Sequence, residues 1–255
     1  MRLVIAGPLV FALVCAGIWE GLTRLGVVDQ SLLPPFSMVA VILWHLVEDP
    51  GFRSDLGITS IEIAVAFLVS VPIAIGTGFY LAERRRHADS FTPLLYTALA
   101  VPQSVFLPIF ILAFGIGFFE KVLFGITHAY FVIVINTFAA ARSVPAPFVL
   151  AARAFGATRR QIYFQIYMPA MLPLVLTGLR LGMIACIIGV LLTEMYASRW
   201  GVGRRIFGWG EAYQVPQLLA GVLLISVLTI LVNESMRLFE VHAAQRYGLL
   251  GRDNK

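Results

Sequence analysis

Residues 150–169 read LAARAFGATRRQIYFQIYMP and separate two long apolar stretches of the chain. Gly156 occupies the position at which a left-handed residue commonly ends a helix. Thr158, followed three residues later by Gln161, forms the pattern of a capping box that begins a second helix, and Pro169 is expected to end that helix and to start the next span. The segment therefore predicts two short helices around a glycine turn, with a basic side that carries Arg153, Arg159 and Arg160.

The chain around this segment has the composition of a membrane protein. Of its 255 residues, 59% are hydrophobic and 13% are charged, whereas soluble domains carry roughly 25% charged residues. The net charge of +5 rests almost wholly on arginine and is scattered, so no nucleic-acid partner is expected. Cys15 and Cys186 lie within apolar runs and do not form a disulfide framework.

Six stretches are long enough to cross a bilayer as helices, which takes about 20 apolar residues. The predicted spans are Leu3–Trp19, Ser60–Leu81, Phe91–Phe118, Val122–Ala141, Ala170–Tyr196 and Val215–Met236. The first is interpreted as an uncleaved span, because no convincing cleavage site follows it. The third and fifth contain proline or glycine, so they are expected to tilt or kink. The fold class is an all-α integral membrane protein.

The arginine and lysine distribution predicts that both termini are cytoplasmic. With that orientation the cytoplasmic connections hold twice as many of these residues as the external ones. The largest cytoplasmic loop is then 142–169. Residues 1–59 are expected to form the first span and an external connection with a short interfacial helix, which Ser37 caps and Pro50-Gly51 ends. Residues 60–255 are expected to form a core of five spans that carries the loop.

Loop 142–169 has two interpretations at this point. Positive-inside charge on an interfacial amphipathic helix accounts for its arginines. A docking element for a cytoplasmic protein accounts also for its ordered caps, since a flexible basic loop would set topology equally well.

Enzymatic sites are not found in the sequence. A P-loop needs glycine before its lysine, but Glu120 and Asn254 precede the only two lysines. The chain is therefore expected not to hydrolyse ATP. It has no H-E-x-x-H, no G-x-S-x-G and no histidines at metal-ligand spacing, so no catalytic residue, metal or cofactor of its own is expected.

Polar side chains at membrane depth are costly and tend to face a cavity or the bundle interior. The candidates for lining a translocation path are Gln103, His128, Asn136, Arg180 and Glu194. Gln103 follows Pro102, where a kink would open space. For His128 a packed, hydrogen-bonded role is the alternative, and for Arg180 an anchor to a helix end or carboxylate. Gly178 and Gly182 allow close helix approach within one subunit or across a dimer.

The expected external connection after the fifth span contains SRWGVGRRIFGWGEAY, residues 198–213, with Arg199, Arg204 and Arg205. Ordinary scatter or an ion pair with Glu211 explains these arginines. Alternatively, they attract an anionic substrate or the acidic rim of a binding protein.

Loop 142–169 also carries a family resemblance. Permeases of binding-protein-dependent ABC importers have the motif E-A-A-x3-G-x9-I-x-L-P, and Ala151, Ala152, Gly156, Ile166 and Pro169 fall on its spacing. Leu150 stands where the family usually has glutamate. LPPFSMV, FILAFGIG, INTFAAARSV, LTGLRLG and LLTEMYASRWGVG resemble stretches of the nitrate/sulfonate/taurine/bicarbonate branch.

The resemblance implies a type I ABC importer permease with the MetI-like fold in the bacterial inner membrane. It implies that the loop couples to ATPase subunits through Leu150, Ala151, Ala152, Arg153, Gly156, Ala157, Arg159, Arg160, Ile166 and Pro169. ATP and Mg²⁺ would bind the ATPase. A periplasmic or lipid-anchored solute-binding protein and a second permease copy, forming a homodimer in membrane lipid, complete the assembly.

The resemblance implies a small anionic substrate such as a sulfonate, taurine or nitrate. A pyrimidine, riboflavin precursor or aromatic carboxylate is the alternative within the branch. A secondary transporter without an ATPase is a different class, which the single coupling-type loop and the few acids at mid-membrane disfavour.

Overall fold

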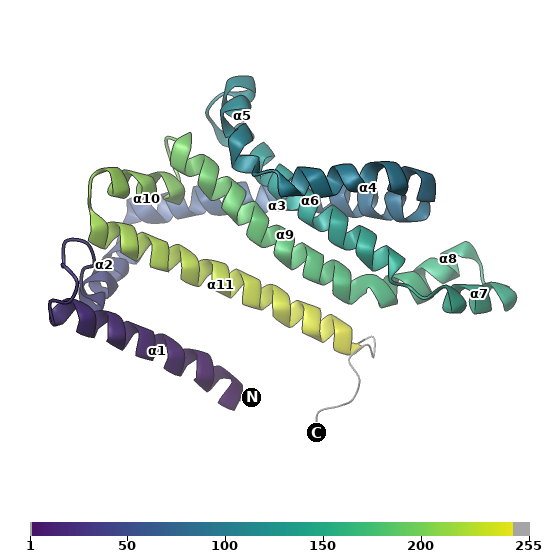
Figure 1. The fold of residues 1–255 in the computed structure, drawn as a ribbon, viewed down its shortest axis with the longest axis horizontal. Coiled ribbons are helices and arrows are strands. Elements are labelled where there is room, and N and C mark those ends of the chain that lie inside the picture. Colours follow the sequence, from purple (N-terminus) through teal and green to yellow (C-terminus); the bar gives the residue numbers. More distant parts are fainter. Residues whose placement is uncertain (1, 247–255) are drawn as a thin grey trace. The chain divides into compact units, whose positions relative to one another are not determined.

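The computed structural model describes residues 2–246, without the side chains of 2–6, 8, 9, 85 and 246. Within that part every regular element is helical, which confirms the all-α prediction (Figure 1). Four stretches are long and apolar enough to cross a membrane: α3 (Pro50–Glu83), α6 (Phe118–Arg142), Arg159–Tyr196 and α11 (Val215–Arg246). The first predicted span lies in α1 (Arg2–Arg24), part of whose side chains are outside the described residues.

The third predicted span is a broken pair rather than one helix. α4 (Arg85–Ala100) is followed by a short 3₁₀ turn, η1 (Gln103–Phe106), and by α5 (Leu107–Phe114). The two arms meet at 84°. Pro102 disfavours a helical conformation at Val101, which is extended here, so the kink expected from proline is a full break.

α3 begins ten residues before the predicted span, so Pro50-Gly51 follows the end of the short helix at Glu48, as predicted, and also starts the next helix. Proline suits the first helical turn, where its missing N–H is not needed. The Asp49 carboxylate accepts hydrogen bonds from the backbone N–H groups of Gly51 (3.1 Å) and Phe52 (2.9 Å). Asp49 therefore caps α3 and ends the preceding helix, α2 (Phe36–Glu48).

Ser37 is not the cap of α2. It lies inside the helix, and its N–H and hydroxyl both donate to the carboxylate of Glu20 on α1, each at 2.9 Å. An acidic side chain 17 residues away thus satisfies the start of α2.

The fifth predicted span begins earlier than expected because Pro169 does not interrupt it. α8 (Arg159–Ile162), a π-helical turn η2 (Tyr163–Tyr167) and α9 (Met168–Tyr196) form one stretch of 38 residues. The N–H of Met168 donates to the carbonyl of Tyr163, five residues back. The wider turn makes room for the proline ring, which would clash with the preceding turn of a regular α-helix.

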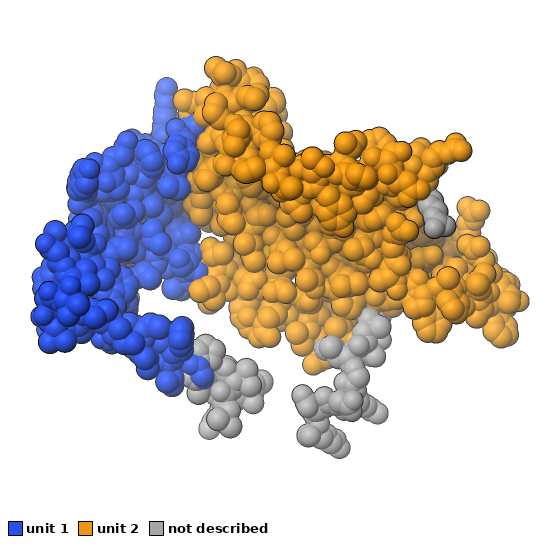
Figure 2. Space-filling model, in the orientation of Figure 1, with its two compact units in different colours: residues 1–59, 194–228 blue, residues 60–193, 229–255 orange. Residues whose placement is uncertain are grey.

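The described chain divides into two compact units, which Figure 2 shows in different colours. Unit 1 comprises residues 1–59 and 194–228, and unit 2 comprises 60–193 and 229–255. In unit 1, α2, the start of α3, α10 (Val202–Glu211) and the start of α11 share a core around Val39, Phe52 and Leu224. Phe52 stacks on Trp209, with ring centroids 6.2 Å apart.

In unit 2, α3, α6 and α9 pack closely around small residues such as Ala66, Ala129 and Cys186. A Cβ at Gly178 would lie 2.5 Å from Asn136 Cβ, and one at Gly182 would lie 2.4 Å from Ile133 Cγ1. Both glycines of the GxxxG pattern therefore face α6 of the same chain.

Candidate functional site

Loop 142–169 folds as one short helix, a glycine turn and the start of the 38-residue stretch Arg159–Tyr196, so the second of the two short helices predicted is the beginning of a long one. α7 (Ala146–Ala154) ends at Phe155, and Gly156 follows with φ of 77° in the left-handed region. The Thr158 N–H donates to Gln161 Oε1 (2.8 Å), and the Gln161 N–H donates to Thr158 Oγ1 (3.3 Å). These two bonds confirm the capping box at the start of α8.

The side chains of this loop expose apolar groups beside cationic ones. Phe155 is 91% exposed, Leu150 64% and Phe148 63%. Of the residues assigned to ATPase coupling, Ala151, Arg153, Gly156, Arg159 and Arg160 are also exposed, whereas Ala152, Ala157, Ile166 and Pro169 are half-buried. A surface of this kind suits a protein partner with apolar and acidic groups.

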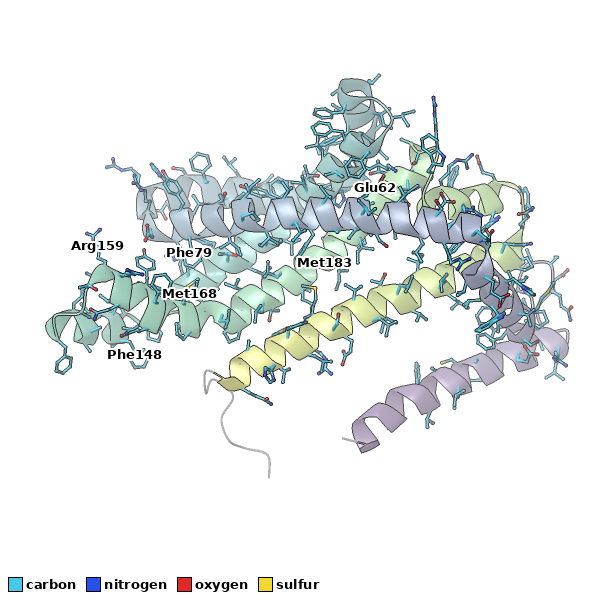
Figure 3. All side chains as sticks on the ribbon, turned by 180° about the vertical axis from the view of Figure 1, so that it is seen from behind. Glu62, Phe79, Phe148, Arg159, Met168 and Met183 are labelled. Atoms are coloured by element: carbon cyan, nitrogen blue, oxygen red, sulfur yellow. The ribbon has the colours of Figure 1, made fainter. Side chains whose placement is uncertain are left out.

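A cavity of about 490 Å³ lies where the loop meets the end of α3. Arg84, Arg153 and Arg159 line it together with Glu83, so its charge is positive. Phe79, Tyr163 and Tyr167 supply aromatic walls. Figure 3 shows Arg159, Phe79, Phe148 and Met168 at the same end of unit 2, while Glu62 lies farther along α3.

Among the predicted path residues, Gln103 lines a cavity. A space of about 250 Å³ lies at the break after α4, and its lining includes Gln103, Phe110 and Phe124. The Gln103 Oε1 atom is buried and has no hydrogen-bond partner among the described residues.

Three of the other candidates form hydrogen bonds or an ion pair within unit 2. His128 Nδ1 lies 3.0 Å from the Phe124 carbonyl oxygen. Asn136 donates to the Val132 carbonyl at 2.8 Å. Arg180 forms an ion pair with Glu240 of α11, with 3.1 Å between Nε and Oε2. Their lining of a path stays a prediction.

Glu194 lies in unit 1 and is fully buried. Its carboxylate accepts hydrogen bonds from the Thr59 hydroxyl (2.7 Å) and from the Gly203 N–H (2.8 Å). It thereby joins the end of α9 to the start of α10.

In the connection after α9, Arg205 pairs with Asp55 and with Asp49 (3.2 Å), not with Glu211. The N–H groups of Phe52 and Gly51 hold the pKa of Asp49 below its ordinary value of 3.8, and Arg205 adds to this effect. The pairing partner expected from the sequence is therefore wrong, because α10 turns Arg205 toward the start of α3.

Sequence reasoning missed a buried charged cluster in unit 2. Lys121 is 3% exposed and forms an ion pair with Glu62 of α3. Glu120 beside it is fully buried. The sequence signal for this ion pair is an acid, Glu62, within one apolar run and a lysine, Lys121, at the start of another.

Comparison with known proteins identifies the fold and the family. Residues 70–248 match the family described as "Binding-protein-dependent transport system inner membrane component". The chain belongs to this family. It is thus the permease component of an ABC importer and a multi-pass protein of the inner membrane.

Curated relatives place the permease in the nitrate/sulfonate/taurine branch. SsuC of Bacillus subtilis, which carries the name of an aliphatic sulfonates transport permease, is 28% identical over 89% of this chain and 82% of its own length. The taurine permease TauC of Escherichia coli K12 is 26% identical over 86% and 82%. The formylaminopyrimidine permease ThiX of Halalkalibacterium halodurans is 26% identical over 88% and 89%.

A solved structure confirms the MetI-like fold. An inward-facing MetNI methionine ABC transporter contains a chain that superposes with a TM-score of 0.63 at 18% identity, over 79% of this chain and 97% of that one.

Proposed function

We propose that the permease takes up movement from a separate ATP-hydrolysing subunit through loop 142–169 and uses it to import a small solute. One observation carries this proposal: α8, η2 and α9 are continuous from Arg159 to Tyr196. A displacement of the loop would therefore pass along the continuous backbone, through the π-helical turn η2, to a membrane-crossing helix.

The movement of α9 passes to two further helices of unit 2. Arg180 and Thr177 of α9 both bond to Glu240 of α11, the threonine at 2.6 Å. Gly178 and Gly182 hold α9 against α6. Displacement of loop 142–169 by the ATPase would thus tilt α6, α9 and α11 together, which is the rocking motion expected for alternating access.

The docking surface on the permease consists of the exposed residues of loop 142–169. Phe155 is the apolar anchor, because it is almost fully exposed and follows directly on α7. Arg153 and Arg159 supply positive charge around it. Leu150 replaces the usual glutamate with a second apolar contact. ATP and Mg²⁺ would be held by the partner ATPase.

The proposed assembly contains two ATPase subunits, an external solute-binding protein and a second permease copy. Sulfonate and taurine permeases among the relatives favour a small organic anion as the substrate. A nitrogen heterocycle is a second candidate, favoured by the relative named for formylaminopyrimidine and by the aromatic cavity beside Gln103.

Co-purification tests the docking site. The permease is expressed with the ATPase encoded beside it, and Gly156→Glu is expected to lose the ATPase, because the left-handed turn and the surface around it would both be disturbed. Gly57→Glu is the matched control, since Gly57 is exposed on α3 with open space around it. Retention of the ATPase by Gly156→Glu would contradict docking at this loop.

A further inference from the structure

Two hollows adjoin each other where loop 142–169 meets the end of α3. The first is the arginine-lined cavity of about 490 Å³. The second is an open groove of about 620 Å³, which shares Phe79, Glu83 and Tyr163 with the cavity. All residues that line either hollow belong to unit 2. The groove is further lined by Gly76, Tyr80, Arg160, Phe164 and Met168.

The cavity has an excess of positive charge. Its three arginines, Arg84, Arg153 and Arg159, face a single carboxylate, Glu83. None of these arginines forms an ion pair with a carboxylate in the described part of the chain. The Arg84 guanidinium instead lies over the Tyr80 ring, 5.2 Å from its centroid. Because the planar guanidinium group binds two oxygens of a phosphate at once, such a cluster favours a phosphate-bearing anion.

The groove is mainly apolar and follows two stretches that cross the membrane. From Glu83 it extends along α3 to Gly76, which is about 10 Å of helix. Met168, on its other wall, belongs to the stretch Arg159–Tyr196. Tyrosines gather at the membrane–water interface, and Tyr80 and Tyr163 lie at the end of the groove that adjoins the cavity. This arrangement puts the arginines at the level of lipid headgroups and the groove at the level of acyl chains.

A ligand that fills both hollows must be amphipathic and negatively charged. Inorganic phosphate would pair with the arginines but would leave the apolar groove uncovered. A lipid without net charge would cover the groove but would not neutralise the arginines. An acidic side chain of the ATPase would reach the cavity alone. An anionic phospholipid satisfies both, and basic pockets between membrane helices are known to bind such headgroups.

We propose that the cavity and the groove together bind one anionic phospholipid. Its phosphate lies among Arg84, Arg153 and Arg159. One acyl chain lies along the groove, in which Phe79 and Met168 are seen at the same end of unit 2 as Arg159 (Figure 3). The lipid thereby joins the connection between α3 and α4 to the helices of the loop.

The lipid site goes beyond the proposed import function and is independent of the solute that is imported. Phe148, Leu150 and Phe155, the exposed apolar residues of the docking surface, line neither hollow. The lipid therefore leaves these contacts available to the ATPase, and both bind the loop at the same time.

The test uses the permease assembled with its ATPase and delipidated in detergent. Binding of the first lipid molecule is followed by native mass spectrometry. Three probes separate the possible sources of the anion: phosphatidylglycerol, phosphatidylcholine with the same acyl chains, and glycerol phosphate, which lacks the chains. Phosphatidylglycerol is expected to bind about tenfold more tightly than phosphatidylcholine. Glycerol phosphate is expected not to displace it, since it cannot cover the groove.

Two variants separate the site from general surface charge. Arg84→Gln is expected to weaken phosphatidylglycerol about fivefold and to leave phosphatidylcholine unchanged. Arg86→Gln is the matched control, because it removes the same charge from an exposed position that lines neither hollow. It is expected to leave both affinities unchanged. A phosphatidylglycerol with a photoreactive acyl chain is expected to label residues 76–80 and 163–168, and to label them less in Arg84→Gln.

The proposal is overturned if the two lipids bind equally, if Arg86→Gln weakens phosphatidylglycerol as much as Arg84→Gln does, or if glycerol phosphate displaces the lipid. It is also overturned if phosphatidylglycerol binds only after the ATPase has been removed, since the ATPase would then fill the cavity. The ATPase content is recorded in the same preparation. An intact complex without a lipid preference contradicts the lipid site alone, whereas a wild-type permease that does not assemble with the ATPase contradicts the proposed function.

Discussion

Lys121 shows how strongly a single residue can depend on its partner in an apolar bundle. Its ammonium group is enclosed with the carboxylate of Glu62, 59 residues earlier in the chain, and the Glu120 carboxyl lies in the same buried region. Removing one member of a buried pair leaves an uncompensated charge, whereas replacing both members by apolar residues is tolerated better.

Lys121→Met is therefore expected to destabilise the permease by about 3–5 kcal/mol. The double variant Glu62→Leu/Lys121→Met is expected to recover much of this loss. Thermal unfolding in detergent measures both. A double variant that is as unstable as the sum of the two single ones would contradict the pairing.

Asp49 gives unit 1 a dependence on acidic pH. Its pKa is lowered in the folded state by the N–H groups of Phe52 and Gly51 and by Arg205. The stabilisation is thus complete above the ordinary pKa of 3.8 and is lost as pH falls through the lowered folded value. Asp49→Asn keeps a capping oxygen but no charge, so its melting temperature is expected to fall less steeply than that of wild type as pH falls below 3.8.

The reference for this comparison is Asp89→Asn, at an exposed acid near the start of α4. If Asp49→Asn and wild type lose stability with the same slope, the cap of α3 does not act through its charge.

The ends of helices could be predicted from the sequence where the capping residues are neighbours in the chain. Gly156 and the Thr158–Gln161 pair were predicted because a C-cap glycine and a capping box are defined by short spacing. Pro169 does not end the helix that it was predicted to end, and Pro50 starts α3 as well as following the end of α2. Proline both starts and ends helices, and the Asp49 cap or the π turn before Met168 decides which occurs.

Contacts between elements that are distant in the chain could not be predicted from sequence spacing. The pairing of Glu62 with Lys121 and the choice of Asp55 over Glu211 by Arg205 depend on how helices are oriented after folding. The 84° break after α4 likewise depends on where α5 packs on α6, since Pro102 predicts a kink without its size.

The close approach of α9 to α6 yields a prediction at the scale of elements. Gly182→Val would place side-chain atoms where Ile133 Cγ1 lies, since a Cβ alone would be 2.4 Å from it. Overpacking of this kind costs about 1–3 kcal/mol or more, and Ile133→Ala in the same chain should restore part of it. Both effects are expected in the melting temperature of the purified permease.

The control is Gly76→Val on α3, where a Cβ meets nothing within 4 Å. Had the GxxxG pattern served a dimer instead, Gly182→Val would change the oligomeric state and leave the melting temperature of the subunit as it was.

At the scale of the whole molecule, composition and span counting sufficed for the fold class, and the coupling-loop motif sufficed for the family. The coupling-loop motif does not predict the substrate class, because relatives at similar identity carry the names of sulfonate, taurine and formylaminopyrimidine permeases. The cytoplasmic position of both termini and of loop 142–169 remains the orientation predicted from the arginine distribution.

The central claim is that loop 142–169 receives the ATPase. A photo-crosslinking amino acid at position 155 tests it most directly, with position 213 as control, because Phe155 and Tyr213 are 91% and 89% exposed and both follow a short helix. The whole transporter is irradiated in membranes and the crosslinked products are identified by mass spectrometry. The account predicts a crosslink to the ATPase from position 155 and none from 213. A crosslink to the ATPase from 213, or its absence at 155 in an assembled transporter, would contradict it.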